Sequence, residues 1–256
     1  MRGKTFVVTG AASGIGQATA LRLAELGAAG IAISDVDHEG LKKTEALCIQ
    51  FTTSILIDVV DVSNVEQVNS WISKTLSQFG RIDGAANIAG IALGGGQATE
   101  NIDQLAWDRM ISINLTGVMN CMRAQLLHIT KPGGSIVNVS STSGLRGLPH
   151  NAAYASSKFG VIGLTESAAG EYGKQGVRVN AILPGPIDTK IFREGEAKGL
   201  FNADVVSGGT LMGRMGQAEE VAKVLAFMLS DDASYVTGAH WTVDGGYSAC
   251  GFYRAG

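Results

Sequence analysis

Short runs of apolar and β-branched residues alternate with longer helical patterns along most of this chain. Several of the short runs lack the apolar–polar alternation of a half-exposed strand. Strands that are apolar on both sides are typical of a parallel sheet covered by helices on both faces. The seven predicted strands are Thr5–Thr9, Ile31–Ser34, Ser54–Ile57, Gly84–Asn87, Ser135–Val139, Val177–Ile182 and Trp241–Val243.

Six helical patterns lie between these runs. Strand–helix alternation implies right-handed crossovers, and therefore a doubly wound α/β fold with about seven parallel strands flanked by helices. Because the chain has 256 residues and no linker or repeat, we expect a single domain over residues 1–256. The predicted helices are Gly16–Leu26, Gly40–Cys48, Val65–Phe79, Trp107–Ile129, Ala155–Lys174 and Ala218–Leu229.

One long connection interrupts the alternation, at residues 189–213 between the sixth strand and the last helix. A connection of this length in a compact domain is usually a functional lid or a disordered loop. We therefore expect a substrate lid here. Its apolar residues suit a hydrophobic ketone or alcohol, and its basic residues either are solvated or meet a substrate carboxylate. The apolar ones are Ile191, Phe192, Leu200, Phe201 and Leu211, and the basic ones are Lys190, Arg193 and Lys198.

Composition excludes several classes of partner. Twenty basic residues against 23 acidic ones give a net charge of −3, so no basic surface is predicted for nucleic acid or membrane lipid. No apolar run approaches the ~18 residues of a membrane span. Cys48, Cys121 and Cys250 are scattered without a CxxC spacing, so we expect no metal site and a reducing compartment, the cytoplasm.

A glycine-rich turn joins the first strand directly to the first helix. Gly10, Gly14 and Gly16 follow a G-x3-G-x-G spacing. Glycines let backbone amides approach a pyrophosphate at a helix N-terminus, and a strand before with a helix after is the context this motif requires. The alternative is an ordinary glycine turn. The context favours dinucleotide binding.

An acidic residue, Asp35, ends the second strand, 19 residues beyond Gly16. A carboxylate there accepts hydrogen bonds from the adenosine ribose and repels the 2′-phosphate of NADP, which favours NAD. The alternative role, a cap for the next helix, fits Asp37 better.

Tyr154 and Lys158 are four positions apart in a helical pattern, which places both side chains on one face. The pair is either a reactive acid with its tuning cation or an ordinary ring beside a solvated amine. Six further motifs bear on the choice. They are DV at Asp61–Val62, NIAG at Asn87–Gly90, INLTG at Ile113–Gly117, VNVSS at Val137–Ser141, PGPIDT at Pro184–Thr189 and TGAHWTVDGG at Thr237–Gly246.

With these motifs, the chain resembles the classical short-chain dehydrogenase/reductase family from Lys4 to Tyr247. The resemblance implies a Rossmann fold and an NAD-dependent oxidoreductase that transfers a hydride between nicotinamide and a secondary alcohol or ketone. One departure is Ile88, where the family usually has a second asparagine. The alternatives are an NADP-dependent carbonyl reductase, which Asp35 disfavours, and a non-catalytic NAD-binding regulator.

The resemblance also implies four catalytic residues. Tyr154 would be the general acid/base, and Lys158 would bind the nicotinamide ribose and lower the tyrosine pKa from its usual ~10 toward ~7. Ser141 would hydrogen-bond the substrate oxygen, and Asn114 would hold a relay water. Ser140, Thr142 and Ser143 are alternatives to Ser141 for this contact with the substrate oxygen. Cofactor contacts are implied for Gly10, Ser13, Gly14, Ile15, Gly16, Asp35, Asp61, Val62, Asn87, Gly90, Tyr154, Lys158, Pro184, Ile187 and Thr189.

The substrate itself is not defined by the sequence. Its determinants should lie in residues 91–100, residues 143–151 and the lid, and His150 is either a pocket residue or an exposed loop residue. The two long helical patterns, 107–129 and 155–174, are apolar around more than one face, which favours burial against a partner subunit. In the family these helices and the C-terminal segment form two interfaces, so we expect a homotetramer.

Overall fold

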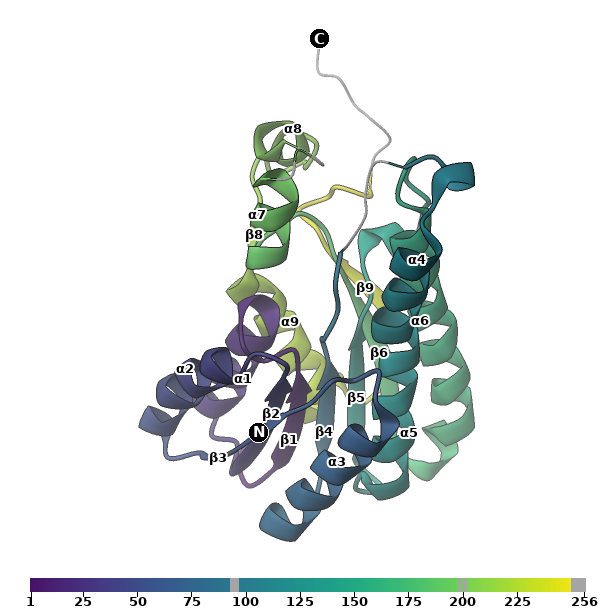
Figure 1. The fold of residues 1–256 in the computed structure, drawn as a ribbon. Helices are drawn as coiled ribbons and strands as arrows, with labels where there is room; N and C mark the ends of the chain where they lie inside the picture. Colours follow the sequence, from purple (N-terminus) through teal and green to yellow (C-terminus); the bar gives the residue numbers. More distant parts are fainter. Residues whose placement is uncertain (93–96, 198, 200–201, 250–256) are drawn as a thin grey trace.

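The computed structural model describes residues 1–92, 97–197, 199 and 202–249. Seven parallel strands form one sheet in the order β3-β2-β1-β4-β5-β6-β9 (Figure 1). All seven predicted runs belong to this sheet, so the predicted doubly wound α/β fold is confirmed. The strands are β1 Thr5–Thr9, β2 Gly30–Asp35, β3 Ser54–Val59, β4 Gly84–Asn87, β5 Ser135–Val139, β6 Arg178–Pro184 and β9 His240–Val243.

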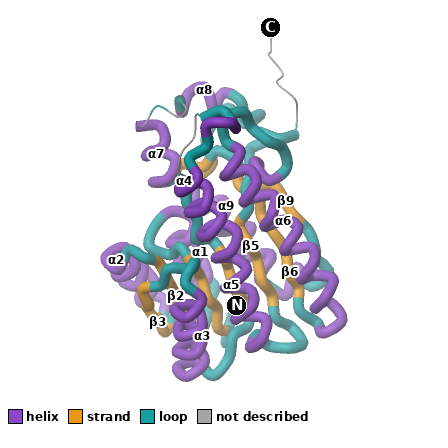
Figure 2. Tube along the Cα trace, turned by 45° about the vertical axis from the view of Figure 1, so that its right-hand side comes forward, coloured by secondary structure: helices purple, strands orange, loops and turns teal. Residues whose placement is uncertain are grey.

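Helices cover both faces of the sheet (Figures 1 and 2). Alternation along β1 shows the two cores, because Phe6 and Val8 pack into one apolar cluster and Val7 packs into the other. No helix in the described ranges is both long and apolar enough to cross a membrane. Helices α1 Gly14–Glu25, α2 His38–Cys48 and α9 Ala218–Leu229 contribute to the first cluster, and α3 Val65–Phe79, α5 Gly117–His128 and α6 Ala152–Tyr172 to the second.

The helix predicted at 107–129 is interrupted in the structure. Helix α4 (Gln104–Ile111) passes through a π-helical turn, Ser112–Thr116, before α5 begins. The helix starts earlier than predicted because Asp103 caps it, accepting a 2.7 Å hydrogen bond from the Ala106 amide. The apolar pattern continues through the π turn, so periodicity gave no sign of it. Such turns occur frequently at functional sites.

The long connection at 189–213 contains two helices, α7 Lys190–Ala197 and α8 Ala203–Gly208. Neither helix was among the helical patterns identified in the sequence. Both helices lie at the end of the molecule beyond the carboxyl ends of the strands (Figure 1). A two-residue strand, β7 (Ile187–Asp188), pairs with β8 (Gly216–Gln217) at its base. The lid residues Lys198, Leu200 and Phe201 lie outside the described residues.

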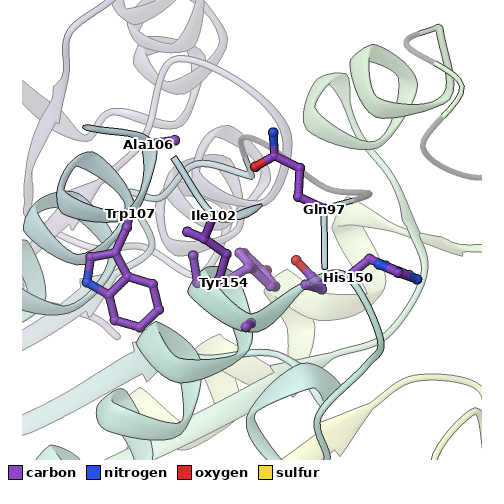
Figure 3. Close-up of a pocket in the computed structure, with 9 residues that line it drawn as sticks. Gln97, Ile102, Ala106, Trp107, His150 and Tyr154 are labelled. Atoms are coloured by element: carbon purple, nitrogen blue, oxygen red, sulfur yellow. The ribbon is translucent and has the colours of Figure 1, made fainter. Parts of the chain in front are cut away.

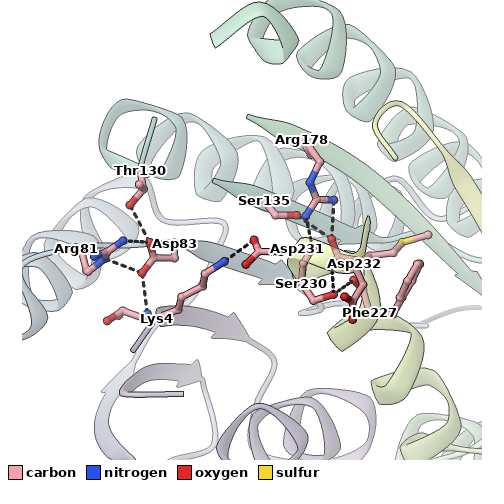
Figure 4. A network of polar contacts seen from close by, with 12 residues as sticks. Lys4, Arg81, Asp83, Thr130, Ser135, Arg178, Phe227, Ser230, Asp231 and Asp232 are labelled. Atoms are coloured by element: carbon pink, nitrogen blue, oxygen red, sulfur yellow. Dashed lines mark hydrogen bonds and ion pairs between the residues drawn. The ribbon is translucent and has the colours of Figure 1, made fainter. Parts of the chain in front are cut away.

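Ionic and polar contacts join the amino-terminal ends of the strands, opposite the end of the molecule where α7 and α8 lie (Figure 4). Asp83, just before β4, accepts hydrogen bonds from the Thr5 amide, the Arg81 guanidinium and the Thr130 hydroxyl. Burial works to raise the pKa of Asp83, but these hydrogen bonds and the Arg81 charge outweigh it and lower the pKa. Lys4 meets Asp231 at 2.6 Å at the same end of the sheet. These contacts hold the strands together at their amino-terminal ends, and a cleft lies at their carboxyl ends.

Candidate active site

A cleft of about 600 Å³ runs along the carboxyl ends of the strands and includes the point between β1 and β4 where the strand order reverses. Doubly wound sheets bind ligands in such crevices. All but two of the residues predicted as catalytic or cofactor-binding line it. These are Gly10, Ser13, Gly14, Ile15, Gly16, Asp35, Asp61, Val62, Gly90, Ser141, Tyr154, Lys158, Pro184, Ile187 and Thr189.

The glycine loop has no room for side chains. Gly10 has a φ of +69°, and a Cβ there would lie 2.8 Å from the backbone of Ala89. A Cβ on Gly16 would lie 2.0 Å from the carbonyl oxygen of Gly10. The turn therefore depends on these glycines to bring the N-terminus of α1 to the cleft, where backbone amides and the helix dipole favour an anion. The cradle fits the pyrophosphate of a dinucleotide.

Asp35 supports the same loop from the end of β2. Its Oδ2 accepts a 3.1 Å hydrogen bond from the Ala12 amide, and its Oδ1 accepts one of 3.1 Å from the Asp37 amide. Asp37 caps α2 by accepting a 3.0 Å hydrogen bond from the Gly40 amide. Asp37 is the cap of α2, as the sequence suggested, and both acids line the cleft. The contact of Asp35 with a ribose stays a prediction.

Tyr154 and Lys158 lie one turn apart on α6, with the lysine Nζ 5.6 Å from the centroid of the tyrosine ring. Lys158 is 4% exposed, and its Nζ donates a 3.0 Å hydrogen bond to the Val139 carbonyl oxygen at the end of β5. Burial lowers the pKa of Lys158 to about 8, so the amine still carries a proton at neutral pH. The chain thus holds a buried ammonium beside a phenol.

The pKa of Tyr154 differs from the expectation based on the lysine. Burial raises it, and a hydrogen bond with Ser141 lowers it by less, so the net direction is upward. Lys158 is not among the causes of this shift. Desolvation of the buried phenol is therefore the dominant effect, and the hydrogen bond with Ser141 offsets only part of it. The protein's own groups therefore keep the phenol protonated at neutral pH.

Contacts within the protein distinguish Ser141 from its neighbours as the residue that would bind the substrate oxygen. Ser141 bonds with Tyr154, and its Oγ also accepts a 3.1 Å hydrogen bond from the Ser143 amide. The Ser140 hydroxyl instead donates a 2.8 Å hydrogen bond to the backbone carbonyl of Lys158. Thr142 and Ser143 are buried and do not line the cleft. The geometry favours Ser141 as the residue that would face a substrate oxygen.

Asn114 lies in the π-helical turn, fully buried behind the cleft wall. Its Oδ1 accepts a 2.8 Å hydrogen bond from the Ile91 amide, and its Nδ2 donates one of 2.9 Å to the Ile91 carbonyl. A Cβ on Gly90 would lie 3.2 Å from Asn114 Oδ1 and 3.4 Å from Lys158 Nζ. A glycine at this position therefore lets the asparagine and the lysine approach each other. The relay water stays a prediction.

Asn87 is placed differently from the expectation of a ribose contact. Its side chain is 1% exposed and does not line the cleft. Its Nδ2 donates to Gln125 Oε1 at 3.0 Å and to Asn138 Oδ1 at 2.9 Å, and its Oδ1 accepts from Gln125 Nε2 at 2.8 Å. The side chain joins β4 to β5 and α5 in the core, which leaves only the backbone near the cleft.

Several cleft residues were absent from the sequence prediction. Val36, Val60 and Ala89 each follow a strand, and position after a strand would have been a sufficient signal for them. Arg109 and Ile113 reach the cleft from α4 and the π turn; Ile113 begins the INLTG motif, but no sequence pattern marks Arg109. Helix α7 adds to the cleft wall with Lys190, Ile191, Phe192 and Glu194.

His150 lies beside Tyr154 in a second, much smaller cavity of about 20 Å³ (Figure 3). Trp107 and Ile102 line this cavity from the segment that includes α4. His150 adopts a φ of +64°, which is uncommon for a residue other than glycine and is found mainly at tight turns or functional sites. His150 is exposed and lines this small cavity but not the large cleft, so both sequence alternatives, a pocket residue and an exposed loop residue, stay open.

Comparison with known proteins extends over nearly the whole chain. Residues 10–248 match a family model described as enoyl-(acyl carrier protein) reductase. The chain is 42% identical over 251 residues to short-chain dehydrogenase/reductase ABA4 of Pyricularia oryzae, covering 96% of this chain and 93% of that protein. It is 37% identical over 247 residues to cyclohexanol dehydrogenase of Acinetobacter sp., covering 96% and 95%.

Solved structures share the fold closely. Levodione reductase superposes with a TM-score of 0.90 at 37% identity, covering 98% of this chain and 100% of the other. Carveol dehydrogenase from Mycobacterium avium, solved with NAD, gives 0.90 at 30% identity, covering 98% and 99%. A variant of actinorhodin polyketide ketoreductase, solved with NADPH, gives 0.87 at 29% identity, covering 95% and 97%.

Proposed function

This chain belongs to the short-chain dehydrogenase/reductase family, and from that premise we propose that it is an NAD-dependent oxidoreductase that interconverts a secondary alcohol and its ketone. The observation that carries the proposal is the grouping of Ser141, Tyr154 and Lys158 at one end of a cleft whose other end is the glycine loop. A regulator that only bound a dinucleotide would need the loop but not a phenol held by a serine beside a buried ammonium.

In ketone reduction, Tyr154 donates its proton to the carbonyl oxygen, and in alcohol oxidation it takes the proton back. A bound nicotinamide dinucleotide supplies or accepts the hydride. Ser141 holds the same oxygen through a hydrogen bond, so the oxygen is positioned by two groups. The Lys158 ammonium would hold the ribose of a bound nicotinamide nucleotide through hydrogen bonds, and its charge would favour negative charge developing on the phenol oxygen. Asn114 supports the wall behind Lys158 through the backbone of Ile91.

NAD is the proposed cofactor because Asp35 stands at the end of β2 with its carboxylate on the cleft wall. A 2′-phosphate at that position would meet a negative charge, whereas ribose hydroxyls would donate hydrogen bonds to it. Val36, the next residue, is 68% exposed and brings no positive charge to offset the acid. An NADP-dependent carbonyl reductase would need a basic group here.

The proposed substrate is a cyclic aliphatic alcohol or ketone. One relative is named for cyclohexanol. The substrate side of the cleft carries Ile91, Ile191 and Phe192 on its wall, which suits an apolar ring. Lys190 Nζ lies 4.0 Å from Glu194 Oε1 on α7, and Arg193 pairs with Asp188, so each of these two basic residues of the lid has an acidic partner. This pairing favours a neutral substrate over a carboxylate.

We also propose that residues 1–256 form one domain with a lid at 189–213. Support comes from the sheet, which combines strands from the first ten residues and from residues 240–243. Cys48 and Cys121 are free and buried, and burial raises their thiol pKa values to about 11 and about 12. Unreactive free thiols fit a reducing compartment such as the cytoplasm.

The test measures cofactor binding and turnover separately. Binding is followed by the fluorescence of NADH and NADPH on the purified protein, and turnover by NADH formation with a panel of cyclic and acyclic secondary alcohols. We expect tighter binding of NADH and turnover of cyclic alcohols. Dinucleotide binding without turnover of any alcohol or ketone would favour the regulator, and a preference for NADPH would contradict the assignment of Asp35.

A further inference from the structure

The turn formed by residues 244–248 contacts three separate parts of the substrate side of the molecule. Asp244 closes the turn by accepting hydrogen bonds from the amides of Gly246 and Ser248, at 3.0 and 2.9 Å. At its start, a Cβ on Gly185 would lie 2.5 Å from the Asp244 side chain, so the turn packs directly on a residue of the cleft wall. We call residues 244–248 the C-terminal turn.

The second contact is with the base of the lid. The Met212 amide donates a 3.2 Å hydrogen bond to the Gly245 carbonyl oxygen. A Cβ on Gly246 would lie 2.7 Å from the Leu211 side chain, and one on Gly209 would lie 3.2 Å from the Tyr247 ring. The segment that follows α8 is therefore packed against the C-terminal turn, with the Tyr247 ring at the end of the helix.

The third contact is with the loop that joins Ser141 to Tyr154. Arg146, in that loop, donates a 3.1 Å hydrogen bond from Nη2 to the Tyr247 carbonyl oxygen. Its guanidinium carbon also lies 5.3 Å from the centroid of the Tyr247 ring. A planar guanidinium over an aromatic face, with a hydrogen bond from the same group, fixes both the ring and the loop.

We propose that Arg146 and Tyr247 are positioning residues for the substrate, because they join the loop between Ser141 and Tyr154 to the base of the lid. The loop begins at Ser141 and ends at Tyr154, which both line the cleft, and the lid lines the cleft through residues 189–192 and Glu194. Their separation sets the space left for a substrate. The glycine loop and Asp35 make none of these contacts, so we expect a change in these contacts to affect substrate binding more than cofactor binding. This inference rests on the proposed oxidoreductase function.

The test compares Arg146→Met and Tyr247→Ala with the wild type in steady-state kinetics. Loss of the contact between Arg146 and Tyr247 should raise KM for a cyclic alcohol roughly three- to ten-fold, which is the range expected for one cation–π contact with one hydrogen bond. The kcat should fall less than KM rises, and NADH affinity should stay at the wild-type value. Arg146→Met removes the cation–π contact and the hydrogen bond, whereas Tyr247→Ala removes the ring and keeps the backbone carbonyl. Because the cation–π contact is common to both variants, the effects of the two substitutions on KM should be less than additive in the double variant.

Matched controls separate this role from general destabilisation. Tyr247→Phe keeps the ring and the carbonyl and should retain a KM near the wild-type value. Tyr235→Ala removes a fully exposed tyrosine and should change nothing. Hydrogen exchange gives a readout without substrate. The Met212 amide, which donates to the C-terminal turn, should exchange faster in Tyr247→Ala and in Arg146→Met but not in Tyr247→Phe.

The outcomes distinguish a failure of the proposed oxidoreductase function from a failure of the inference about Arg146 and Tyr247. Absence of turnover in the wild type contradicts the proposed function. Wild-type turnover with an unchanged KM in both variants contradicts the inference alone, and so does a lowered unfolding temperature with unaltered KM. A rise in KM that Tyr247→Phe shares in full would also overturn it, because the hydroxyl takes no part in either contact described here.

Discussion

The Ser140 hydroxyl and the backbone carbonyl of Lys158 form a 2.8 Å hydrogen bond at the end of β5. The residues on either side also hold α6, since Val139 accepts from Lys158 Nζ and Ser141 bonds with Tyr154. Three consecutive residues, the last of β5 and the two that follow it, thus hold the part of α6 that carries Tyr154 and Lys158. These contacts set the distance between the end of β5 and the part of α6 that carries Tyr154 and Lys158.

Replacing Ser140 by alanine should reduce kcat roughly ten-fold, because a small displacement of Tyr154 and Lys158 misaligns the proton transfer. The loss of one buried hydrogen bond should cost about 1 kcal/mol of stability. Ser167→Ala is the matched control, since its hydroxyl bonds the Gly163 carbonyl farther along the same helix, on the exposed side. Equal kcat losses in both variants would show that helix stability, rather than placement, is responsible.

Lys158→Met should abolish turnover and weaken NADH binding, yet raise the unfolding temperature at neutral pH. The folded-state pKa is lowered to about 8 from an ordinary 10.5, so the unfolded state binds more protons between those values. Stability contributed by this group therefore increases as pH rises from about 8 to 10.5, and burying the charge has its full cost below that window. Lys174→Met, at an exposed position, should leave the unfolding temperature unchanged at every pH.

Asp35 is predicted to select the cofactor. Asp35→Ala should lower NAD affinity and raise the relative use of NADP, because it removes both the charge and an acceptor for the Ala12 amide. Asp35→Asn keeps an acceptor oxygen and removes only the charge, so it should retain more NAD affinity while still admitting NADP. Ratios of kcat/KM for the two cofactors decide the matter. Unaltered ratios in both variants would remove Asp35 from the cofactor site.

A homotetramer requires contact surfaces that are exposed in the single chain, and the structure shows which residues of α6 are exposed enough to test it. Ala168 lies in the core of its own chain and Leu164 packs against that core, so neither is a clean probe of an interface. Phe159 is 44% exposed on α6, and Gly163 is exposed one turn later. Gly163→Arg should reduce the assembly mass measured by light scattering. A wild-type mass of one chain with full activity would refute the tetramer.

Sequence patterns were enough for the sheet because strand length, β-branched composition and missing alternation all pointed the same way. The predicted β1, β4 and β5 have the observed bounds. The lid was harder, since α7 and α8 are short and contribute few residues to the two large cores. Helix α8 depends on a local cap, with Asn202 Oδ1 accepting from the amides of Asp204 and Val205.

The site could be predicted where single residues stand in a fixed relation to a strand or a helix. Glycines after β1, an acid after β2 and a Tyr-x3-Lys pair need only local geometry, and all of them line the cleft. Properties that depend on long-range packing were missed. The Asn87 side chain turned inward to Gln125, and burial, which outweighs the hydrogen bond with Ser141, raises the pKa of Tyr154.

The most direct measurement of the central claim is NADH formation by Tyr154→Phe, with cyclohexanol as substrate and cofactor binding measured on the same sample. The variant lacks the phenol proton but keeps the ring beside Lys158, so the account predicts near-normal NADH binding and loss of turnover by several orders of magnitude relative to an active wild type. Turnover by Tyr154→Phe at a rate close to that of the wild type would contradict the role assigned to this tyrosine.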